Sequence, residues 1–193
     1  MNILDLGCGA NKRPGAFGVD WADGPQVDLV HDLDRFPYPI DDNSFDHVVA
    51  SHIVEHLIDV PGFFREIHRI CTPGALVEVV TPHFSNRSAY ADPTHHHAFS
   101  VRFLDFFCGS SPRPLDFFHK AAHYMLEHRF EFTPFDTPTP FAMQSLRLSF
   151  SKLFTWIGVA AIANNALDLY EFYFAFVLPA RDIFAELKVV KEG

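Results

Sequence analysis

Short apolar segments that each run into a glycine or an acidic residue restrict the fold of this chain more than any other feature. The predicted strands are Ile3–Leu6, Phe17–Trp21, Val27–His31, Phe45–Ser51 and Leu76–Thr81. Gly7 follows the first of them, while Asp20 and Asp32 mark the ends of the second and third. Between the last two, Pro61–Cys71 repeats apolar side chains at helical spacing. Strands joined through a helix in this way predict a parallel α/β sheet.

The connections between the first strands are too short to hold full helices. About ten residues separate the first two predicted strands and about five separate the next two, whereas a parallel crossover with its helix takes about a dozen or more. Parallel sheets are normally covered on both faces. Of the 22 phenylalanines, 16 lie from Phe99 onward. We therefore expect this aromatic second half, or a second subunit in a homodimer, to supply the missing cover.

The second half of the chain is expected to contain helices and then an antiparallel strand pair. Apolar periodicity predicts a helix at about Ser100–Phe107 and an amphipathic helix over Leu146–Ala163. The Pro-rich segment Thr133–Pro140 is predicted to be a loop. Glu171–Leu178 and Phe184–Val190 flank a turn signal, which predicts a hairpin.

Composition disfavours several classes of function. Fifteen basic and 24 acidic residues give a net charge of −9, which argues against a nucleic-acid backbone as partner. The three cysteines form no CxxC pair, so neither a disulfide framework nor a structural zinc site is expected, and a reducing cytoplasm is favoured. The first residues lack the pattern of a secretory signal. The longest apolar stretches, near Ile157–Ala163 and Phe172–Ala180, are too short to span a bilayer.

Glycines and an aspartate at the ends of the first two strands predict a nucleoside-binding site. Gly7 and Gly9 let a ligand approach the backbone closely. Asp20, one strand later, can accept hydrogen bonds from both hydroxyls of a ribose. Both groups lie at the carboxyl ends of predicted parallel strands, where such sheets bind ligands.

Eight motifs in one order resemble the class I S-adenosylmethionine-dependent methyltransferases of the broad type-11 group. They are Asp5-Leu6-Gly7-Cys8-Gly9, Gly18-Val19-Asp20-Trp21, Asp32-Leu33, Phe36-Pro37-Tyr38-Pro39-Ile40, Asp42-Asn43-Ser44-Phe45-Asp46, Glu55-His56-Leu57, Glu66-Ile67-His68-Arg69 and Thr72-Pro73-Gly74. The resemblance is dense over Ile3–Pro82 and resumes at Asp92-Pro93-Thr94-His95. Asn11 stands where the family has a third glycine, and Ala75 where a second glycine usually follows Pro73.

The resemblance implies a small, truncated form of the methyltransferase fold. This is an α/β, Rossmann-like architecture with a mixed seven-stranded sheet, a C-terminal antiparallel hairpin and an aromatic-rich helical cap. The single domain, 1–193, would consist of a cofactor-binding half at 1–98, a cap or lid at 99–170 and a terminal hairpin at 171–193. The cofactor would be S-adenosyl-L-methionine, and its methyl group would pass to an oxygen or nitrogen of a small molecule.

The resemblance also assigns roles to individual side chains. The implied cofactor-binding residues are Asp5, Gly7, Gly9, Asp20, Trp21, Asp32, Leu33, Ser51 and His52. The two glycines would lie against the methionine part of the cofactor, and Asp5 would orient that turn and meet the ammonium group. Asp20 would take the ribose hydroxyls. Trp21, Asp32 and the Leu33 amide would surround the adenine, while Ser51 and His52 would lie next to the reactive methyl.

A histidine-rich segment supplies the candidates for the acceptor side. His95-His96-His97 follows the fifth predicted strand, on the side where the methyl acceptor would enter. Imidazole titrates near neutral pH and can take a proton from a hydroxyl. His95 is therefore the candidate general base, and the candidate substrate contacts are His83, Asp92 and His97. A solvated loop is the alternative, because neighbouring side chains diverge.

Two other functions compete with methyl transfer. The chain could bind S-adenosylmethionine without catalysis and use its Phe-rich half as a partner interface. Alternatively, His52-Ile53-Val54-Glu55-His56 has the HxxEH form of inverted zinc proteases, in which two histidines on one helical face bind zinc. The order of the flanking strands favours a methyltransferase. We therefore expect no metal, and we expect Glu55 to support the start of the following helix.

Overall fold

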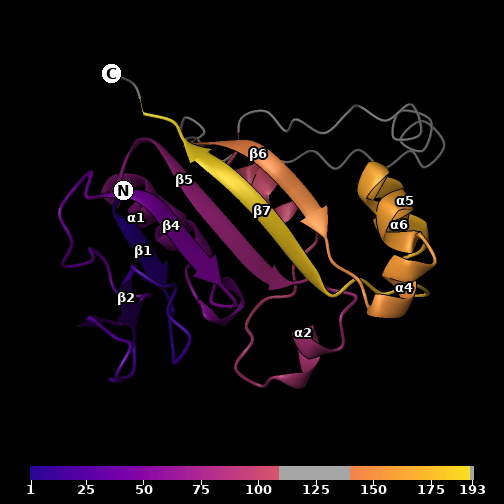
Figure 1. Ribbon diagram of the computed structural model, residues 1–193, viewed down its shortest axis with the longest axis horizontal. Helices are drawn as coiled ribbons and strands as arrows, with labels where there is room; N and C mark the ends of the chain where they lie inside the picture. The colour runs from indigo at the N-terminus through magenta and orange to yellow at the C-terminus, as the bar shows by residue number, and fades with distance from the viewer. Residues whose placement is uncertain (109–139, 192–193) are drawn as a thin grey trace.

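The structure is a computed structural model that describes residues 1–108 and 140–191. Its centre is one seven-stranded sheet with the order β3-β2-β1-β4-β5-β7-β6 (Figure 1). The strands are β1 Ile3–Leu6, β2 Phe17–Asp20, β3 Leu29–Val30, β4 Phe45–Ser51, β5 Cys71–Pro82, β6 Phe141–Leu148 and β7 Asp182–Val189. β1 to β5 are parallel, and β7 runs antiparallel between β5 and β6. The expected mixed seven-stranded sheet is confirmed.

Short helices connect and flank the strands. They are η1 Val54–His56, α1 Val60–Ile70, α2 Ser88–Ala91, η2 Phe103–Phe106, α4 Lys152–Trp156, α5 Val159–Asn165 and α6 Leu167–Tyr173. α1 begins where the Asp59 carboxylate accepts a hydrogen bond from the Gly62 backbone N–H at 2.7 Å, a side-chain cap. Its Phe63, Phe64 and Ile67 are fully buried, so the helical spacing found in the sequence does mark the face that packs on the sheet.

The aromatic second half packs on the same face of the sheet as α1. The Phe107 ring stacks on Phe64 of α1 with centroids 4.2 Å apart, and Phe141 meets the same ring edge-on at 5.8 Å. In Figure 1, α1 lies behind the strands. Phe107 and Phe141 therefore thicken the core on this face of the sheet.

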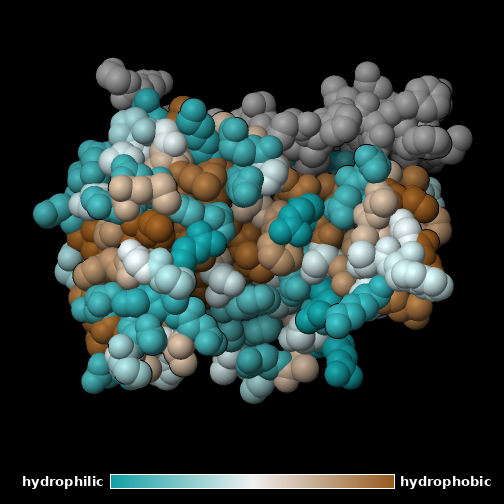
Figure 2. Space-filling model, in the orientation of Figure 1, coloured by the Kyte–Doolittle hydropathy of each residue, from teal (hydrophilic) through white to brown (hydrophobic). Residues whose placement is uncertain are grey.

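Within the described residues, the opposite face of the sheet, here called the polar face, carries charged side chains beside apolar ones such as Phe184. The cover expected from the second half or from a second subunit remains a prediction, because residues 109–139 lie outside the described residues. Along β7, every second residue is buried, while Glu186 and Lys188 between them are exposed. On this face Arg13 holds Glu78 of β5 through two hydrogen bonds of 2.8 Å, and Arg147 lies 4.1 Å above the ring of Phe184. Hydrophilic side chains are interspersed over the face that Figure 2 presents.

The prediction of one amphipathic helix over Leu146–Ala163 is wrong. Residues up to Leu148 form β6, which pairs with β7 over its whole length. The rest forms two short helices, α4 and α5, separated by Gly158 in a left-handed conformation with φ 86°. Pairing with β7 overrides the helical period of Leu146 and its neighbours, because a strand buries Met143 and Leu148 against the core.

The expected C-terminal hairpin is also wrong in its first strand. Glu171 lies in α6, and β7 pairs with β5 and β6, so no strand forms over Glu171–Leu178. The predicted helix at Ser100–Phe107 shortens to the 3-10 helix η2. Because β6 belongs to the sheet, only part of the predicted cap at 99–170 can form a cap. Residues 109–139, which include most of the Pro-rich loop, lie outside the described residues. The domain limits remain predictions.

Exposed apolar side chains gather on α4, α5, α6 and the segment after them. They are Leu153, Trp156, Ile157, Ile162, Phe172, Tyr173, Phe174, Phe176 and Val177. Brown patches at the right of Figure 2 coincide with these helices in Figure 1. Within the described residues, no helix is long and apolar enough to cross a membrane.

The homodimer remains a prediction, which light scattering on Ile157→Asp tests. Ile157 is 52% exposed, so the substitution lowers the molar mass of the particle in solution only if this surface is a subunit interface.

Candidate functional site

A glycine turn follows β1 and is hydrogen-bonded to the carboxyl end of β2. Gly7 has φ 72° and donates its backbone N–H to the Val19 carbonyl at 2.8 Å. Gly9, with φ 50°, donates its N–H to the Asp20 carboxylate at 2.9 Å. A Cβ on Gly7 would lie 2.7 Å from Cγ1 of Ile53, whereas a Cβ on Gly9 would meet nothing within 4 Å. The turn is therefore closed toward the protein at Gly7 and open on the other side at Gly9.

Two buried carboxylates hold this turn in shape. Asp5 is 6% exposed and accepts the Arg13 backbone N–H at 2.7 Å. Burial raises the pKa of Asp5, against the opposing effect of that hydrogen bond. Asp20 is 8% exposed and also accepts the Ala22 N–H at 3.1 Å. A carboxylate has about four acceptor positions, so Asp20 keeps acceptor capacity beyond its two backbone bonds.

The residues expected around the adenine follow β2 and β3. Trp21 is 78% exposed, directly after Asp20. Asp32 is exposed at its carboxylate and pairs with Arg35 at 3.3 Å. Leu33 is buried in the core, and the Tyr38 hydroxyl donates to its carbonyl at 2.9 Å. The structure thus leaves Trp21 and Asp32 accessible to a ligand, whereas the Leu33 side chain serves the core.

Ser51 and His52 end β4 next to the glycine turn. β1 lies between β2 and β4, with Leu6 opposite both Val19 and Ala50. The carboxyl ends of these three strands therefore meet at one edge of the sheet. His52 has φ 54° and donates its backbone N–H to the Val80 carbonyl at 2.8 Å. The Glu55 carboxylate, 3.3 Å from Nδ1, raises the pKa of His52 against the effect of burial.

Glu55 lies at the start of the short helix η1 and also contacts two distant segments of the chain. It is 2% exposed, and its carboxylate accepts the Thr81 hydroxyl at 3.0 Å. Its backbone carbonyl accepts the His96 N–H at 2.8 Å. Glu55 lies in the first turn of η1, the short helix that follows β4, while the start of α1 is capped by Asp59. Glu55 also links β5 to the histidine-rich segment. The HxxEH motif does not indicate this contact.

The HxxEH pattern does not form the metal site of a zinc protease. That site needs both histidines on one face of a helix. Here His52 is in a left-handed conformation and precedes η1, a 3-10 helix of three residues, Val54–His56. His52 and His56 therefore lie on no common helical face.

The histidine-rich segment lies beside Glu55, with its side chains divergent. The Nδ1 atom of His95 is 3.2 Å from the Ala89 carbonyl. Thr94 donates its hydroxyl to Asp92 at 2.6 Å, and this bond with the Thr94 N–H lowers the pKa of Asp92. His96 is exposed. In His97 the Nε2 atom is buried and has no hydrogen-bond partner within the structure.

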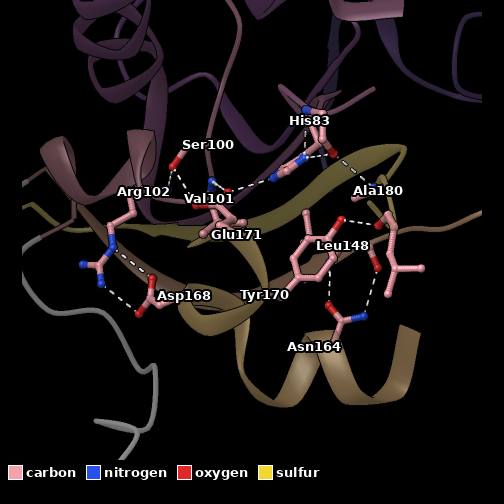
Figure 3. A network of polar contacts seen from close by, with 12 residues as sticks. His83, Ser100, Val101, Arg102, Leu148, Asn164, Asp168, Tyr170, Glu171 and Ala180 are labelled. Atoms are coloured by element: carbon pink, nitrogen blue, oxygen red, sulfur yellow. Dashed lines mark hydrogen bonds and ion pairs between the residues drawn. The ribbon is translucent and has the colours of Figure 1, made fainter. Parts of the chain in front are cut away.

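His83 occupies a buried network instead of an acceptor pocket (Figure 3). The side chain is fully buried, and its Nε2 atom lies 2.8 Å from the Glu171 carboxylate of α6. Its Nδ1 atom accepts the Ser85 backbone N–H at 3.2 Å, so the ring proton sits on Nε2. Glu171 also accepts the Ser100 hydroxyl and the Val101 N–H. Because His83 is fully buried, a methyl acceptor could not contact its side chain. His83 instead anchors α6 to the end of β5.

Comparison with known proteins identifies this architecture. Residues 19–79 match the family model described as a methyltransferase domain. The structure aligns with a SAM-dependent methyltransferase from Archaeoglobus fulgidus over 97% of this chain and 85% of that one, with TM-score 0.53 and 16% identity. The fold is that of the class I S-adenosylmethionine-dependent methyltransferases. The [4+2]-cyclase SpnF shares it, with TM-score 0.54 and 17% identity over 99% of this chain and 75% of that one.

Curated methyltransferases are similar to part of the sequence. Norajmaline N-methyltransferase from Rauvolfia serpentina is 28% identical over 114 residues, 47% of this chain and 39% of that protein. A protein named as a probable S-adenosylmethionine-dependent methyltransferase of Mycolicibacterium smegmatis is 31% identical over 99 residues, 42% of this chain and 38% of that protein. The chain thus spans about two fifths of the length of the curated relatives it matches.

Proposed function

We propose that this chain is a methyltransferase that binds S-adenosyl-L-methionine at the ends of β1, β2 and β4 and methylates an oxygen or nitrogen of a small molecule. The observation that carries the proposal is the open glycine turn at Gly9 beside the spare acceptor positions of Asp20. A nucleoside cofactor needs this combination of close backbone approach and a ribose-binding carboxylate.

The residues around the turn fit the cofactor. Gly7 and Gly9 would lie against its methionine part, with Asp5 shaping the turn through the Arg13 backbone. Asp20 would accept the ribose hydroxyls. The accessible side chains of Trp21 and Asp32, with the Leu33 backbone, would flank the adenine, and Ser51 and His52 would lie toward the transferred group. When bound, the cofactor supplies an electrophilic methyl group.

The protein's own contribution to the transfer is alignment and exclusion of water. Substitution at the methyl carbon requires the nucleophile held about 3–3.5 Å from it and in line with the leaving sulfur. The segment of Asp92, His95 and His97 is hydrogen-bonded to η1, just after β4, through the Glu55 carbonyl, and we assign it to the acceptor side. The ring hydrogen bond of His95 is made through Nδ1, so the lone pair of its Nε2 atom is available to the acceptor side.

Calorimetric titration with S-adenosylhomocysteine tests the cofactor site. Loss of hydrogen bonds to a charged group costs about 1.5–3 kcal/mol, so Asp20→Ala should weaken binding about 10- to 150-fold. Because Asp20 also holds the turn, Trp21→Ala is the second variant: Trp21 is 78% exposed, and its loss should weaken binding without lowering the melting temperature. Asp23→Ala, an exposed neighbour, is the matched control. Unchanged affinity in both site variants would refute the assignment.

A role other than methyl transfer, in catalysis or as a binding scaffold, is the second candidate, because a [4+2]-cyclase shares the fold. The two are separated by incubating the protein with S-adenosylmethionine and pooled small amines and hydroxyl compounds. A methyltransferase releases S-adenosylhomocysteine in proportion to a methylated product. Nitrogen acceptors come first in the pool, because relatives at 28% and 29% identity are named N-methyltransferases. Binding without release would favour a scaffold or a different chemistry.

A further inference from the structure

Glu55, His56 and His95 form a cluster of potential metal ligands between η1 and the histidine-rich segment. One ring nitrogen of each histidine and one carboxylate oxygen of Glu55 lie within 4.8 Å of one another. The two imidazole rings are 4.6 Å apart at their centroids and inclined by 78°. Glu55 and His56 are adjacent in the sequence, but His95 comes about 40 positions later, so the fold brings His95 to the other two.

The hydrogen bonds of His95 and His56 fix the tautomer of each ring. The Nδ1 atom of His95 lies 3.2 Å from the Ala89 carbonyl, which can only accept a hydrogen bond. The Nδ1 atom of His56 lies 2.9 Å from the Thr94 hydroxyl oxygen. That hydroxyl gives its single proton to Asp92 at 2.6 Å, so it accepts from His56. In both neutral rings the proton is therefore on Nδ1, and Nε2 carries a lone pair.

This pattern is the one that metal-ligating histidines show. A histidine that binds a metal through one nitrogen almost always donates its other N–H to a carbonyl, a carboxylate or water, which fixes the tautomer. Here the Ala89 carbonyl serves His95, and Thr94, backed by Asp92, serves His56.

The buried carboxylate of Glu55 adds negative charge to the cluster. It is 2% exposed, and its described partners are the Thr81 hydroxyl and the ring of His52. A buried carboxylate is costly unless it is paired or coordinates a metal. Asp92 stands near as well, with its Oδ2 atom 3.9 Å from Nε2 of His95. Two lone pairs and a buried anion in one place favour a cation.

We propose that Glu55, His56 and His95 bind one divalent transition-metal ion, with Zn²⁺ as the metal that suits the donor set. Two imidazoles and one carboxylate are a ligand set that leaves a coordination position open in catalytic zinc sites. Hard ions such as Mg²⁺ prefer oxygen ligands alone. This proposal revises the expectation, drawn from the sequence, that the chain binds no metal. It also replaces the general-base role of His95, because a metal-bound nitrogen has no lone pair left for a proton.

The place of the cluster suggests what the ion does, and this part rests on the proposed function. Glu55 follows Ser51 and His52 at the carboxyl end of β4. An ion there would have its open position on the acceptor side and would bind an oxygen or nitrogen of the acceptor, lowering the pKa of a hydroxyl without a protein base.

Calorimetric titration of the chelator-treated full chain with Zn²⁺ tests the site directly. We expect one ion per chain, a rise in melting temperature with Zn²⁺ because the folded state alone holds the complete ligand set, and little response to Mg²⁺. His56→Ala and His95→Ala should each weaken Zn²⁺ binding by tenfold or more, and Thr94→Val by about 10- to 100-fold through the loss of its support for His56. His96→Ala is the matched control, since His96 lies in the same segment but is exposed and outside the cluster.

Co²⁺ provides a readout that does not depend on activity. Its visible absorption on binding should be present in the natural chain and in His96→Ala and lost in His95→Ala. Titration with S-adenosylhomocysteine on the same variants separates this proposal from the cofactor assignment, since either can fail alone. If the natural chain binds Zn²⁺ no more tightly than His56→Ala and His95→Ala do, or shows no saturable binding, the proposal is refuted.

Discussion

The buried network around Glu171 should make this residue one of the most costly in the chain to truncate. Its carboxylate accepts hydrogen bonds from Nε2 of His83 at 2.8 Å, from the Val101 N–H at 2.7 Å and from the Ser100 hydroxyl at 3.0 Å (Figure 3). His83 and Val101 are fully buried. In Glu171→Ala both lose their acceptor, at about 1–3 kcal/mol each, while the Ser100 hydroxyl can rotate to another partner.

We therefore expect Glu171→Ala to lower the free energy of unfolding by about 2–6 kcal/mol, the sum of these two losses. Glu171→Gln keeps one acceptor oxygen for Val101 and should lose roughly half as much. Urea unfolding followed by far-ultraviolet circular dichroism measures both, with the slope m checked for constancy.

Glu186→Ala is the matched control for this experiment. Glu186 is the same residue type on the polar face of β7, exposed, with its carboxylate accepting the Ser145 hydroxyl at 2.9 Å. It also lies directly opposite Glu78, so its removal relieves a like-charge pair. We expect a change within about 0.5 kcal/mol. If Glu171→Ala costs no more than Glu186→Ala, the network does not anchor α6 and the reasoning fails.

Two further predictions concern the glycine turn and the polar face. Gly7→Ala should lower the melting temperature far more than Gly9→Ala, because both have positive φ but only Gly7 would press a Cβ against Ile53; equal losses in thermal melts would contradict this. Hydrogen bonds from Arg13 lower the pKa of Glu78 below its ordinary 4.5, so this pair stabilises the folded state above that pH, and its contribution is lost as pH falls from about 4.5 through the lowered pKa. Acid unfolding of Glu78→Gln should accordingly be flatter than that of the natural chain in this window, and a parallel curve would show that the pair adds nothing.

The parallel half of the fold was predictable because local pattern and tertiary role agree there. Ile3–Leu6 and Phe45–Ser51 are strands with the bounds that the sequence indicates, and α1 differs by one residue at each end. Buried parallel strands read as apolar runs whatever their neighbours. The glycine turn was found for the same reason, since a positive φ at Gly7 demands that residue type.

The second half was misread where pairing partners lie far apart in the sequence. β6 and β7 are separated by α4, α5 and α6, and nothing local in Leu146 or its neighbours shows that they pair with a strand near the end of the chain. Long-range pairing of this kind overrides the apolar period, as it does for β6.

At the candidate site, sequence reasoning identified residue types more reliably than their contacts. His83 and Glu55 carried a recognisable chemistry, yet the first proved to be a buried anchor and the second a link to the histidine-rich segment. The tautomers of His56 and His95 depend on Thr94 and Ala89, whose residue types give no sign of such a role. Only the folded chain shows which hydrogen bonds are already taken.

The polar face of the sheet gives the chain a one-sided tolerance to sequence change. Along β7, substitutions at Leu187 should abolish folding, whereas its neighbours Glu186 and Lys188 should accept most residues, because only alternate positions meet the core. The same alternation marks Lys188 as an attachment point for a fluorophore or a solid support that leaves the glycine turn untouched. It also marks a surface on which an additional layer could be built by design, starting from hydrated residues whose replacement the fold can bear.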